Sequence, residues 1–121
     1  MAGDFKKLIV WQRAMDFAEA IYQSTADWPK TEIYGLTQQL RRACVSVASN
    51  IAEGHGRASS KELTQYLRIA NGSRQEAETQ LLIAERLGFL DGTMAKDLYG
   101  RSDEIGRLIF GLIRSVRSKD P

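Results

Sequence analysis

The chain has 121 residues, a length that fits one domain with a hydrophobic core of its own. Hydrophobic residues make up 43% of it and charged residues 26%, a balance that is ordinary for a globular protein and argues against disorder. The formal net charge of +2 is too small to require a nucleic-acid partner, and a single cysteine excludes an internal disulfide and a cysteine-based zinc site.

Two helices are predicted in the N-terminal half, because apolar residues recur there every three or four positions. The first is expected over about residues 8–27, and Pro29 ends it. Its inner stripe is expected to hold Trp11, Ala14, Ala18, Ile21, Tyr22 and Thr25, widened by Val10 and Phe17. The second is expected over about residues 35–53, with Leu36, Leu40, Ala43, Val47 and Ile51 facing inward. Gly54 is expected to be its left-handed C-terminal cap, and Cys44 a buried thiol.

Two further helices are predicted in the C-terminal half. Ser59 and Glu62 have capping-box spacing before a third helix over about residues 60–87, which Gly88 ends. Thr93 is expected to cap a fourth helix over about residues 94–117. Connections of roughly 5–9 residues join antiparallel neighbours. The expected fold is therefore all-α, an antiparallel up-down four-helix bundle forming a single domain over residues 1–121.

The first and fourth helices carry more apolar residues than one buried face needs. The surplus is expected among Val10, Trp11, Met15, Phe17, Ile21 and Tyr22 on the first helix and Ile109, Phe110 and Ile113 on the fourth. Gly100, Gly106 and Gly111 also interrupt the fourth helix. Close approach of another helix would compensate for their low helix propensity, and a kink or a frayed helix end is the alternative explanation. Exposed apolar surface is typical of interaction sites, so the pattern predicts a homo-oligomer.

The segment "NIAEGHGR", residues 50–57, gathers the polar groups that chemistry would need. His55 oriented by Glu53 is a weak candidate for acid–base catalysis, because no nucleophile or metal-ligand set accompanies it. A phosphate-binding loop at residues 54–57 is a second alternative. We favour a structural polar network near the edge of the bundle, formed by Gln39, Asn50, Glu53, Ser73 and Glu76. We expect no enzyme activity, no cofactor and no metal.

Basic residues gather in two stretches. Candidate nucleic-acid contacts are Arg41, Arg42 and Arg57 in the first stretch and Arg107, Arg114 and Arg117 in the second. Arg107 and Arg114 are seven residues apart and therefore share one helical face. An ordinary solvated face is the alternative. In a ring of identical subunits, a modest basic excess would be multiplied and would attract RNA or DNA through phosphates.

Five motifs occur in order: V-W-x-x-A, I-Y-x-x-T, Y-G-L-x-x-Q-x-R-R-A, N-I-A-E-G-x-G-R and I-A-x-G-S-x-x-E. In this combination the chain, from Phe5 to about Ile113, resembles the bacterial four-helix bundle proteins called 23S rRNA-intervening sequence proteins. That family name describes reading frames inside insertions in ribosomal RNA genes, which is a genomic location and not an activity.

The resemblance implies an up-down bundle that assembles as a homopentamer. The family is also similar to accessory proteins of diversity-generating retroelements, which form basic barrels and engage nucleic acid and a reverse transcriptase. The resemblance implies no catalytic residue in this chain. Its polar signature corresponds here to Gln39, Arg41, Arg42, Asn50, Glu53, Arg57, Ser73 and Glu76.

Two functional hypotheses follow. The first is a non-enzymatic, oligomeric bundle that binds structured RNA or other nucleic acid through basic faces. The alternative is a protein–protein assembly module, or accessory subunit, that binds no nucleic acid. The N-terminus has no signal-peptide pattern, and no stretch of about 20 apolar residues could span a membrane, so we expect a cytoplasmic protein with no membrane partner.

Overall fold

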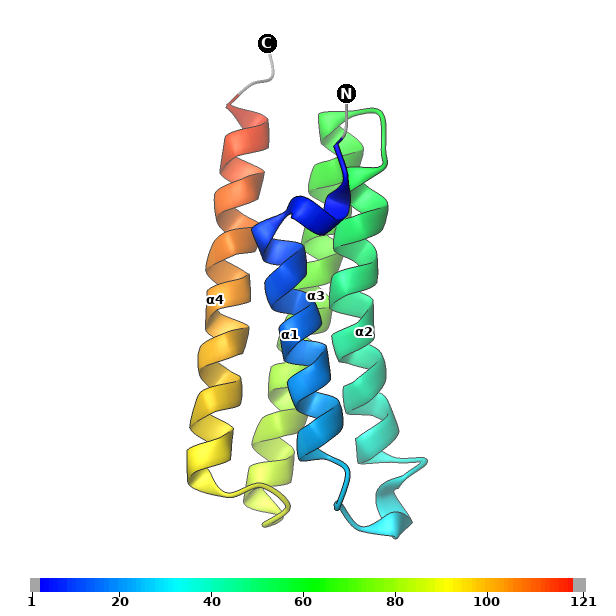
Figure 1. The fold of residues 1–121 in the computed structure, drawn as a ribbon, viewed down its shortest axis with the longest axis vertical. Coiled ribbons are helices and arrows are strands. Elements are labelled where there is room, and N and C mark those ends of the chain that lie inside the picture. Colours follow the sequence, from blue (N-terminus) through cyan, green and yellow to red (C-terminus); the bar gives the residue numbers. More distant parts are fainter. Residues whose placement is uncertain (1–2, 119–121) are drawn as a thin grey trace.

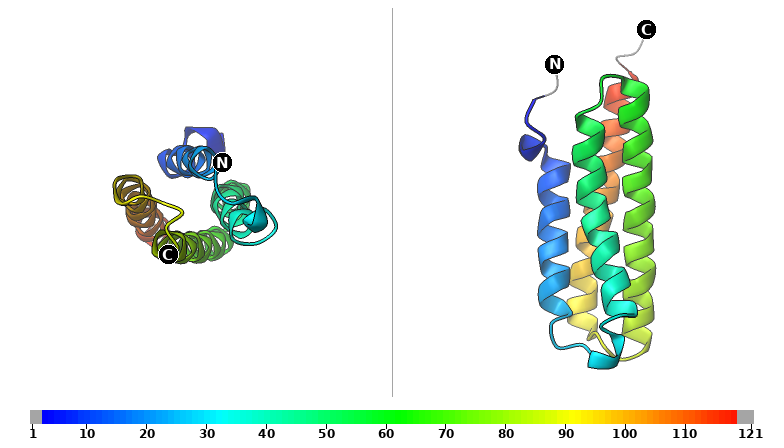
Figure 2. Two further views of the ribbon diagram at one scale, coloured as in Figure 1. Left: turned by 90° about the horizontal axis from the view of Figure 1, so that it is seen from below. Right: turned by 90° about the vertical axis from the view of Figure 1, so that its right-hand side faces the viewer.

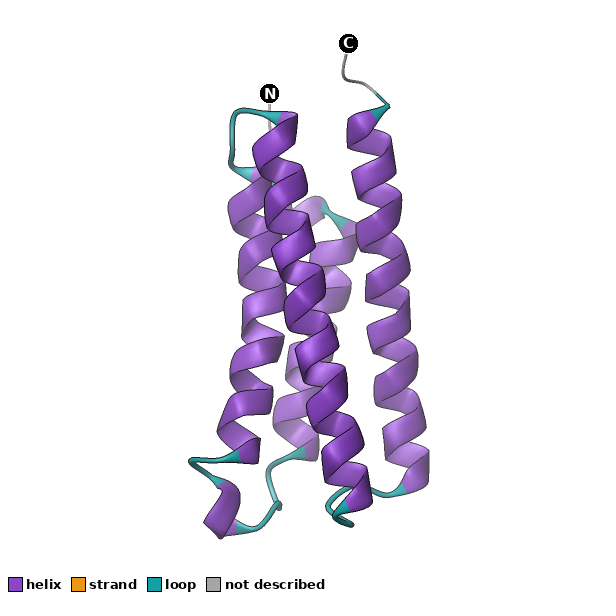
Figure 3. Cartoon of the chain, turned by 180° about the vertical axis from the view of Figure 1, so that it is seen from behind, coloured by secondary structure: helices purple, strands orange, loops and turns teal. Residues whose placement is uncertain are grey.

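The computed structural model describes residues 3–118. It contains four helices, α1 (Ile9–Ser24), α2 (Leu36–His55), α3 (Ser60–Arg86) and α4 (Gly92–Arg117). Two short 3₁₀ helices, η1 (Phe5–Lys7) and η2 (Lys30–Glu32), precede α1 and α2. Consecutive helices run in opposite directions (Figure 1), and the described residues contain no strand (Figure 3). The predicted all-α class and four-helix fold are confirmed.

The helices follow one another around the bundle in chain order. Seen along its axis, they enclose a common core (Figure 2). Each packs against its two sequence neighbours, with α4 closing against α1, and α2 and α3 share the longest contact. The diagonal pairs α1–α3 and α2–α4 make no backbone contact within residues 3–118. Open depressions lie along each of the four seams between neighbouring helices.

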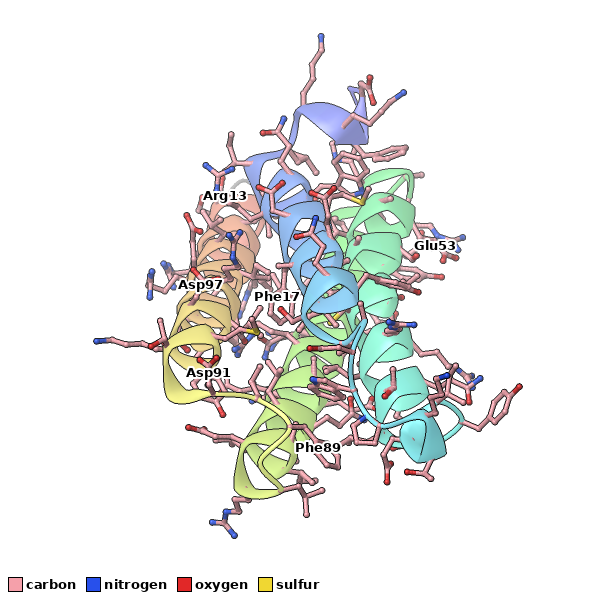
Figure 4. All side chains as sticks on the ribbon, turned by 60° about the horizontal axis from the view of Figure 1, so that its bottom comes forward. Arg13, Phe17, Glu53, Phe89, Asp91 and Asp97 are labelled. Atoms are coloured by element: carbon pink, nitrogen blue, oxygen red, sulfur yellow. The ribbon has the colours of Figure 1, made fainter. Side chains whose placement is uncertain are left out.

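The core stripe of α1 differs from the predicted one. Val10, Ala14, Phe17 and Ile21 are buried, and Phe17 points into the bundle (Figure 4). Tyr22 is instead 46% exposed. The half-buried Trp11 packs edge-on against Phe5, with ring centroids 5.3 Å apart. The apolar arc of α1 is too wide for periodicity to locate its centre.

Much of the predicted apolar surplus belongs to the protein's own core. Val10, Phe17 and Ile21 on α1 and Ile109 and Ile113 on α4 are all buried, so these five residues are not available to a partner. What stays exposed of that surplus is Met15 and Tyr22 on α1 and Phe110 on α4. Cys44 is buried, as predicted, and burial raises the pKa of its thiol to about 12.

Helix α1 ends at Ser24, three residues before the predicted end. The Thr25 hydroxyl donates a hydrogen bond to the Ile21 carbonyl at 2.8 Å and so occupies an acceptor of the last turn. Trp28 then turns into the end of the bundle, where its ring packs 5.8 Å from that of Phe89.

The prediction that Gly54 is a left-handed cap is wrong. Helix α2 continues to His55, and Gly54 is buried inside it against α3. A Cβ atom at this position would lie 2.6 Å from the Tyr66 Cβ, so glycine is required for the close approach of two helices. The one positive φ in the described residues belongs to Gly88, which ends α3 as predicted.

The capping predictions for the last two helices have different outcomes. The Ser59 hydroxyl accepts a hydrogen bond from the Glu62 N–H at 3.1 Å, as predicted for α3. Asp91, not Thr93, caps α4 by accepting the Met94 N–H at 2.8 Å. The prediction for Thr93 is wrong because a cap two residues earlier extends the helix, so that Thr93 lies in its first turn.

Candidate functional site

The "NIAEGHGR" segment contributes to two separate polar clusters. In the first, the Asn50 amide donates to the Ser46 carbonyl at 2.8 Å and to the Ser46 hydroxyl at 2.9 Å. The Ser46 hydroxyl is in turn 2.9 Å from that of Ser73 on α3. Asn50 and Ser73 are thus joined across α2 and α3 through Ser46, a residue that the predicted network did not include.

Glu53 lies in the second cluster, on the outer surface of α2 (Figure 4). Its carboxylate accepts hydrogen bonds from Arg57 at 2.8 Å and from the Tyr66 hydroxyl at 3.1 Å. The Arg57 guanidinium also lies 4.8 Å from the centre of the Tyr66 ring. The hydrogen bond to Glu53, helped by the Coulombic influence of Tyr66, raises the pKa of Arg57. One nitrogen of the exposed Arg57 guanidinium, Nη2, is therefore engaged by Glu53 and Tyr66 at the protein surface.

His55 is the last residue of α2 and not the loop residue that the sequence suggested. Its Nε2 lies 3.0 Å from the Gly3 carbonyl oxygen, so the ring links the end of α2 to the N-terminal segment. Within residues 3–118, no three histidine, cysteine, aspartate or glutamate side chains are grouped closely enough to hold a metal ion.

Arg41 and Arg42 face different grooves. The Arg41 Nε donates to the Thr25 hydroxyl at 2.9 Å, and its guanidinium lies 4.7 Å from the centre of the Tyr22 ring. Arg42 is exposed in the groove between α2 and α3, in an open depression of about 360 Å³ that Gln39 and Glu76 also line. Glu76 accepts a hydrogen bond from Gln80 at 3.2 Å. Ser46 and Ser73 line the same depression, so Gln39 and Glu76 lie beside the Asn50 cluster, whereas Glu53 lies apart.

A second open depression, of about 510 Å³, lies between α3 and α4. Its lining residues are Arg74, Asp103, Gly106, Arg107, Phe110 and Arg114. Arg107 and Arg114 are exposed, and no carboxylate within residues 3–118 is in ion-pair distance of either one. Arg117 is exposed further along the same helical stripe. The predicted arginines of α2 and α4 thus lie on diagonally opposed helices and do not form one face.

Arg74 forms the floor of this depression and was not among the predicted contacts. Its side chain is 12% exposed and lies 3.5 Å from Glu78. Its Nε donates to Asn71 at 2.9 Å, and its Nη1 donates to the Ser102 hydroxyl at 3.2 Å. A Cβ atom on Gly106 would lie 2.8 Å from the guanidinium carbon, so glycine leaves room for Arg74. Gly100 on the same helix has nothing within 4 Å of a hypothetical Cβ, so a glycine in the middle of a helix does not by itself indicate such a close approach.

The grooves on either side of α1 are apolar by contrast. On the α2 side, an open depression of about 400 Å³ is lined by Phe5, Trp11, Met15, Ala18, Val45, Ala48, Ser49 and Ala52. On the α4 side, one of about 280 Å³ is lined by Leu8, Ile9, Val10, Arg107, Leu108, Gly111 and Leu112. No helix within residues 3–118 is both long and apolar enough to cross a bilayer.

The bundle has a counterpart among solved structures. No curated protein matches the chain. A crystal structure of a protein with unknown function from the S23 ribosomal protein family of Bacteroides thetaiotaomicron VPI-5482 is similar, with a TM-score of 0.78 and 22% sequence identity. The similarity covers 87% of this chain and 98% of that one, and at this identity it shows a shared fold. The family model of 23S rRNA-intervening sequence proteins matches residues 6–111, so the chain belongs to that family.

Proposed function

We propose that the protein is a non-enzymatic bundle that binds nucleic acid through phosphate contacts on the C-terminal half of α4. One observation carries this proposal. From Ile105 to Ser118 the chain has three arginines, Arg107, Arg114 and Arg117, and neither aspartate nor glutamate. All three side chains are exposed. The last turns of α4 also rise beyond the start of α1, so α1 does not cover them (Figure 1).

The spacing of these arginines suits contacts with the phosphates of a nucleic-acid backbone. Seven helical residues separate Arg107 from Arg114, which places their Cα atoms ~10 Å apart along the axis. A guanidinium presents several N–H donors in one plane and can bind a phosphate through two of them. Arginines near a helix C-terminus also offset the helix dipole, but that effect is confined to the last turn. Arg107 lies well before the last turn, so the dipole does not account for it.

Salt dependence of RNA binding tests the proposal. We would titrate the full chain into a labelled RNA hairpin between roughly 50 and 200 mM salt, because released counterions weaken phosphate binding steeply over this range. The variant Arg107→Glu/Arg114→Glu should bind at least tenfold more weakly. Its slope of log affinity against log salt should be smaller by roughly 1.4–1.8, the loss of two phosphate contacts.

The matched control is Lys30→Glu/Arg86→Glu, which changes the net charge equally at the opposite end of the bundle, where both side chains are exposed. It should retain most of the affinity. An equal loss in both double variants would show that only net charge matters and would overturn the α4 site. Absence of binding by the unmodified protein at the lowest salt would overturn the function itself.

Self-association is the second candidate property, and the apolar grooves beside α1 support it. Met15 and Val45 are 45% and 44% exposed on one side of α1, and Ile9 is 52% exposed on the other. A ring of identical subunits needs two different surfaces on each copy. The two grooves beside α1 would provide them, and each groove would be covered by one of the two neighbouring copies of this chain. The homopentamer that the family resemblance implies would also repeat Arg114 and Arg117 around the ring, whereas Arg107 borders the α1–α4 groove as well as the α3–α4 depression.

Molar mass in solution, from sedimentation or light scattering, tests self-association. The unmodified chain should exceed its monomer mass of 13.6 kDa, by fivefold for a pentamer. Met15→Glu/Val45→Glu should shift the mass toward the monomer, whereas Leu82→Glu, on an exposed site of α3, should not. A monomeric unmodified chain would overturn this candidate and leave the nucleic-acid proposal to stand on its own test.

A further inference from the structure

The exposed stripe of α4 places an aromatic ring among the arginines. Arg107, Phe110, Arg114 and Arg117 follow one another at spacings of three or four residues, so their side chains lie along one line of the helix. Phe110 is 41% exposed, whereas Phe17 on α1 is fully buried in the core. The ring thus lies between two guanidinium positions at the edge of the α3–α4 depression.

The floor of the depression adds a donor. Arg74 uses Nε and Nη1 for Asn71 and Ser102, whereas its Nη2 makes no hydrogen bond within residues 3–118. That nitrogen lies above Gly106, 3.0 Å from the position of a hypothetical Cβ there. Because Glu78 and Ser102 hold the guanidinium in place, this donor is preorganised and loses little side-chain entropy on binding.

The basic segment is also short. Asp103 lies one turn before Arg107 on the same stripe and marks where the positive segment ends. From Arg107 to Arg117 the helix rises ~15 Å, which limits the contact to a few nucleotides. Contacts to so few phosphates give only weak affinity. Stacking of an unpaired base on an aromatic ring would increase that affinity.

We infer that this surface binds single-stranded nucleic acid, with one unpaired base stacked on Phe110 and the flanking phosphates held by Arg107 and Arg114. This inference rests on the proposed function and adds the class of ligand. A base inside a duplex is already stacked on its neighbours and cannot lie against the ring, so a duplex gains only the phosphate contacts. Stacking and phosphate contact do not read the ribose 2′-hydroxyl, so single-stranded RNA and DNA should bind equally.

Fluorescence anisotropy with three probes of about 12 nucleotides tests the inference: an unstructured RNA strand, the DNA strand of the same sequence, and the RNA duplex. The full chain should bind both single strands more tightly than the duplex. Phe110→Leu, which keeps an apolar side chain but removes the ring, should weaken single-strand binding by roughly 5- to 150-fold and leave duplex binding unchanged. Phe110→Tyr should restore the affinity, because it restores a stacking surface.

The matched control is Leu82→Ala, which removes a comparably exposed apolar side chain from α3 and should change nothing. Duplex binding as tight as single-strand binding, or an unchanged affinity in Phe110→Leu, would overturn the inference while nucleic-acid binding itself stands. Binding of only one of the two single strands would also overturn it, since the sugar would then be read. If the unmodified protein binds none of the probes, the proposed function fails together with the inference.

Discussion

Gly54 on α2 and Tyr66 on α3 lie so close together that a Cβ atom on residue 54 would come within 2.6 Å of the Tyr66 Cβ. The Tyr66 Cβ is bonded directly to the backbone of α3, so rotation of the tyrosine side chain cannot relieve the overlap. The same approach brings the Tyr66 hydroxyl to the Glu53 carboxylate at 3.1 Å. A glycine inside α2 thus determines how closely the two helices with the longest contact can pair.

Gly54→Ala should therefore destabilise the protein by about 1–3 kcal/mol, because the helices must separate to accommodate the methyl group. Urea denaturation followed by circular dichroism measures the change. Gly72→Ala is the matched control: it also lies inside a helix, but nothing would lie within 4 Å of the new Cβ. It should stabilise the protein by roughly 0.5–1 kcal/mol through helix propensity. Equal stabilities of the two variants would contradict the packing explanation.

Asp91→Ala should cost about 1 kcal/mol of the free energy of unfolding, because it removes the carboxylate that accepts the Met94 N–H at 2.8 Å. Thr93→Ala should leave stability within about 0.5 kcal/mol, since Thr93 is an exposed first-turn residue. Both values come from urea denaturation at neutral pH. A larger loss in Thr93→Ala than in Asp91→Ala would mean that α4 begins at the position expected from the sequence.

The Cys44 thiol should be nearly unreactive in the folded protein. Burial raises its pKa from 9.0 to about 12, which lowers the thiolate fraction near neutral pH by roughly a thousandfold. Reaction with a chromogenic disulfide reagent should therefore be at least this much slower in buffer than in denaturant, where the thiol is accessible. Rates within tenfold of each other would show that the core around Cys44 opens readily.

Tyr99 should make the stability depend on alkaline pH. Its hydroxyl donates to Glu85 at 2.7 Å, and burial together with this hydrogen bond raises its pKa from 10.0 to about 12. Between these pH values the folded protein holds a proton that the unfolded chain has lost, so the free energy of unfolding falls as pH rises.

In Tyr99→Phe this fall should be shallower, by at most about 1.4 kcal/mol per pH unit. Urea denaturation at a series of pH values from 9 to 12 measures the slope. Tyr34→Phe serves as the control, because the Tyr34 side chain is 86% exposed and its surroundings therefore change little on unfolding. Parallel curves for the unmodified protein and Tyr99→Phe would show that the Glu85 contact does not hold the proton.

Much of the fold is readable from the sequence because it depends on local chemistry. The apolar period of three to four residues, Pro29 and the capping signature at Ser59 are sufficient to predict four helices, and the short connections predict that they alternate in direction. The sequence also marks Cys44 as a buried residue and Gly88 as a helix end. The sequence alone does not give the role of Gly54, because a glycine near a helix end suits both a left-handed cap and a close helix contact, and the neighbouring helix decides between them.

The candidate site depends more on tertiary structure. From the sequence alone, Arg107 and Arg114 share a helical face, and Asn50 and Ser73 are candidates for one network. Only packing shows that Arg41 lies against Tyr22, that Tyr66 joins Glu53 and Arg57, and that Ser46 joins the two helices. Arg74 reaches the α4 surface because Gly106, 32 residues later, leaves space for it. Helical periodicity gives the direction of each side chain around its own axis, whereas the partner it meets depends on how the other helices are placed.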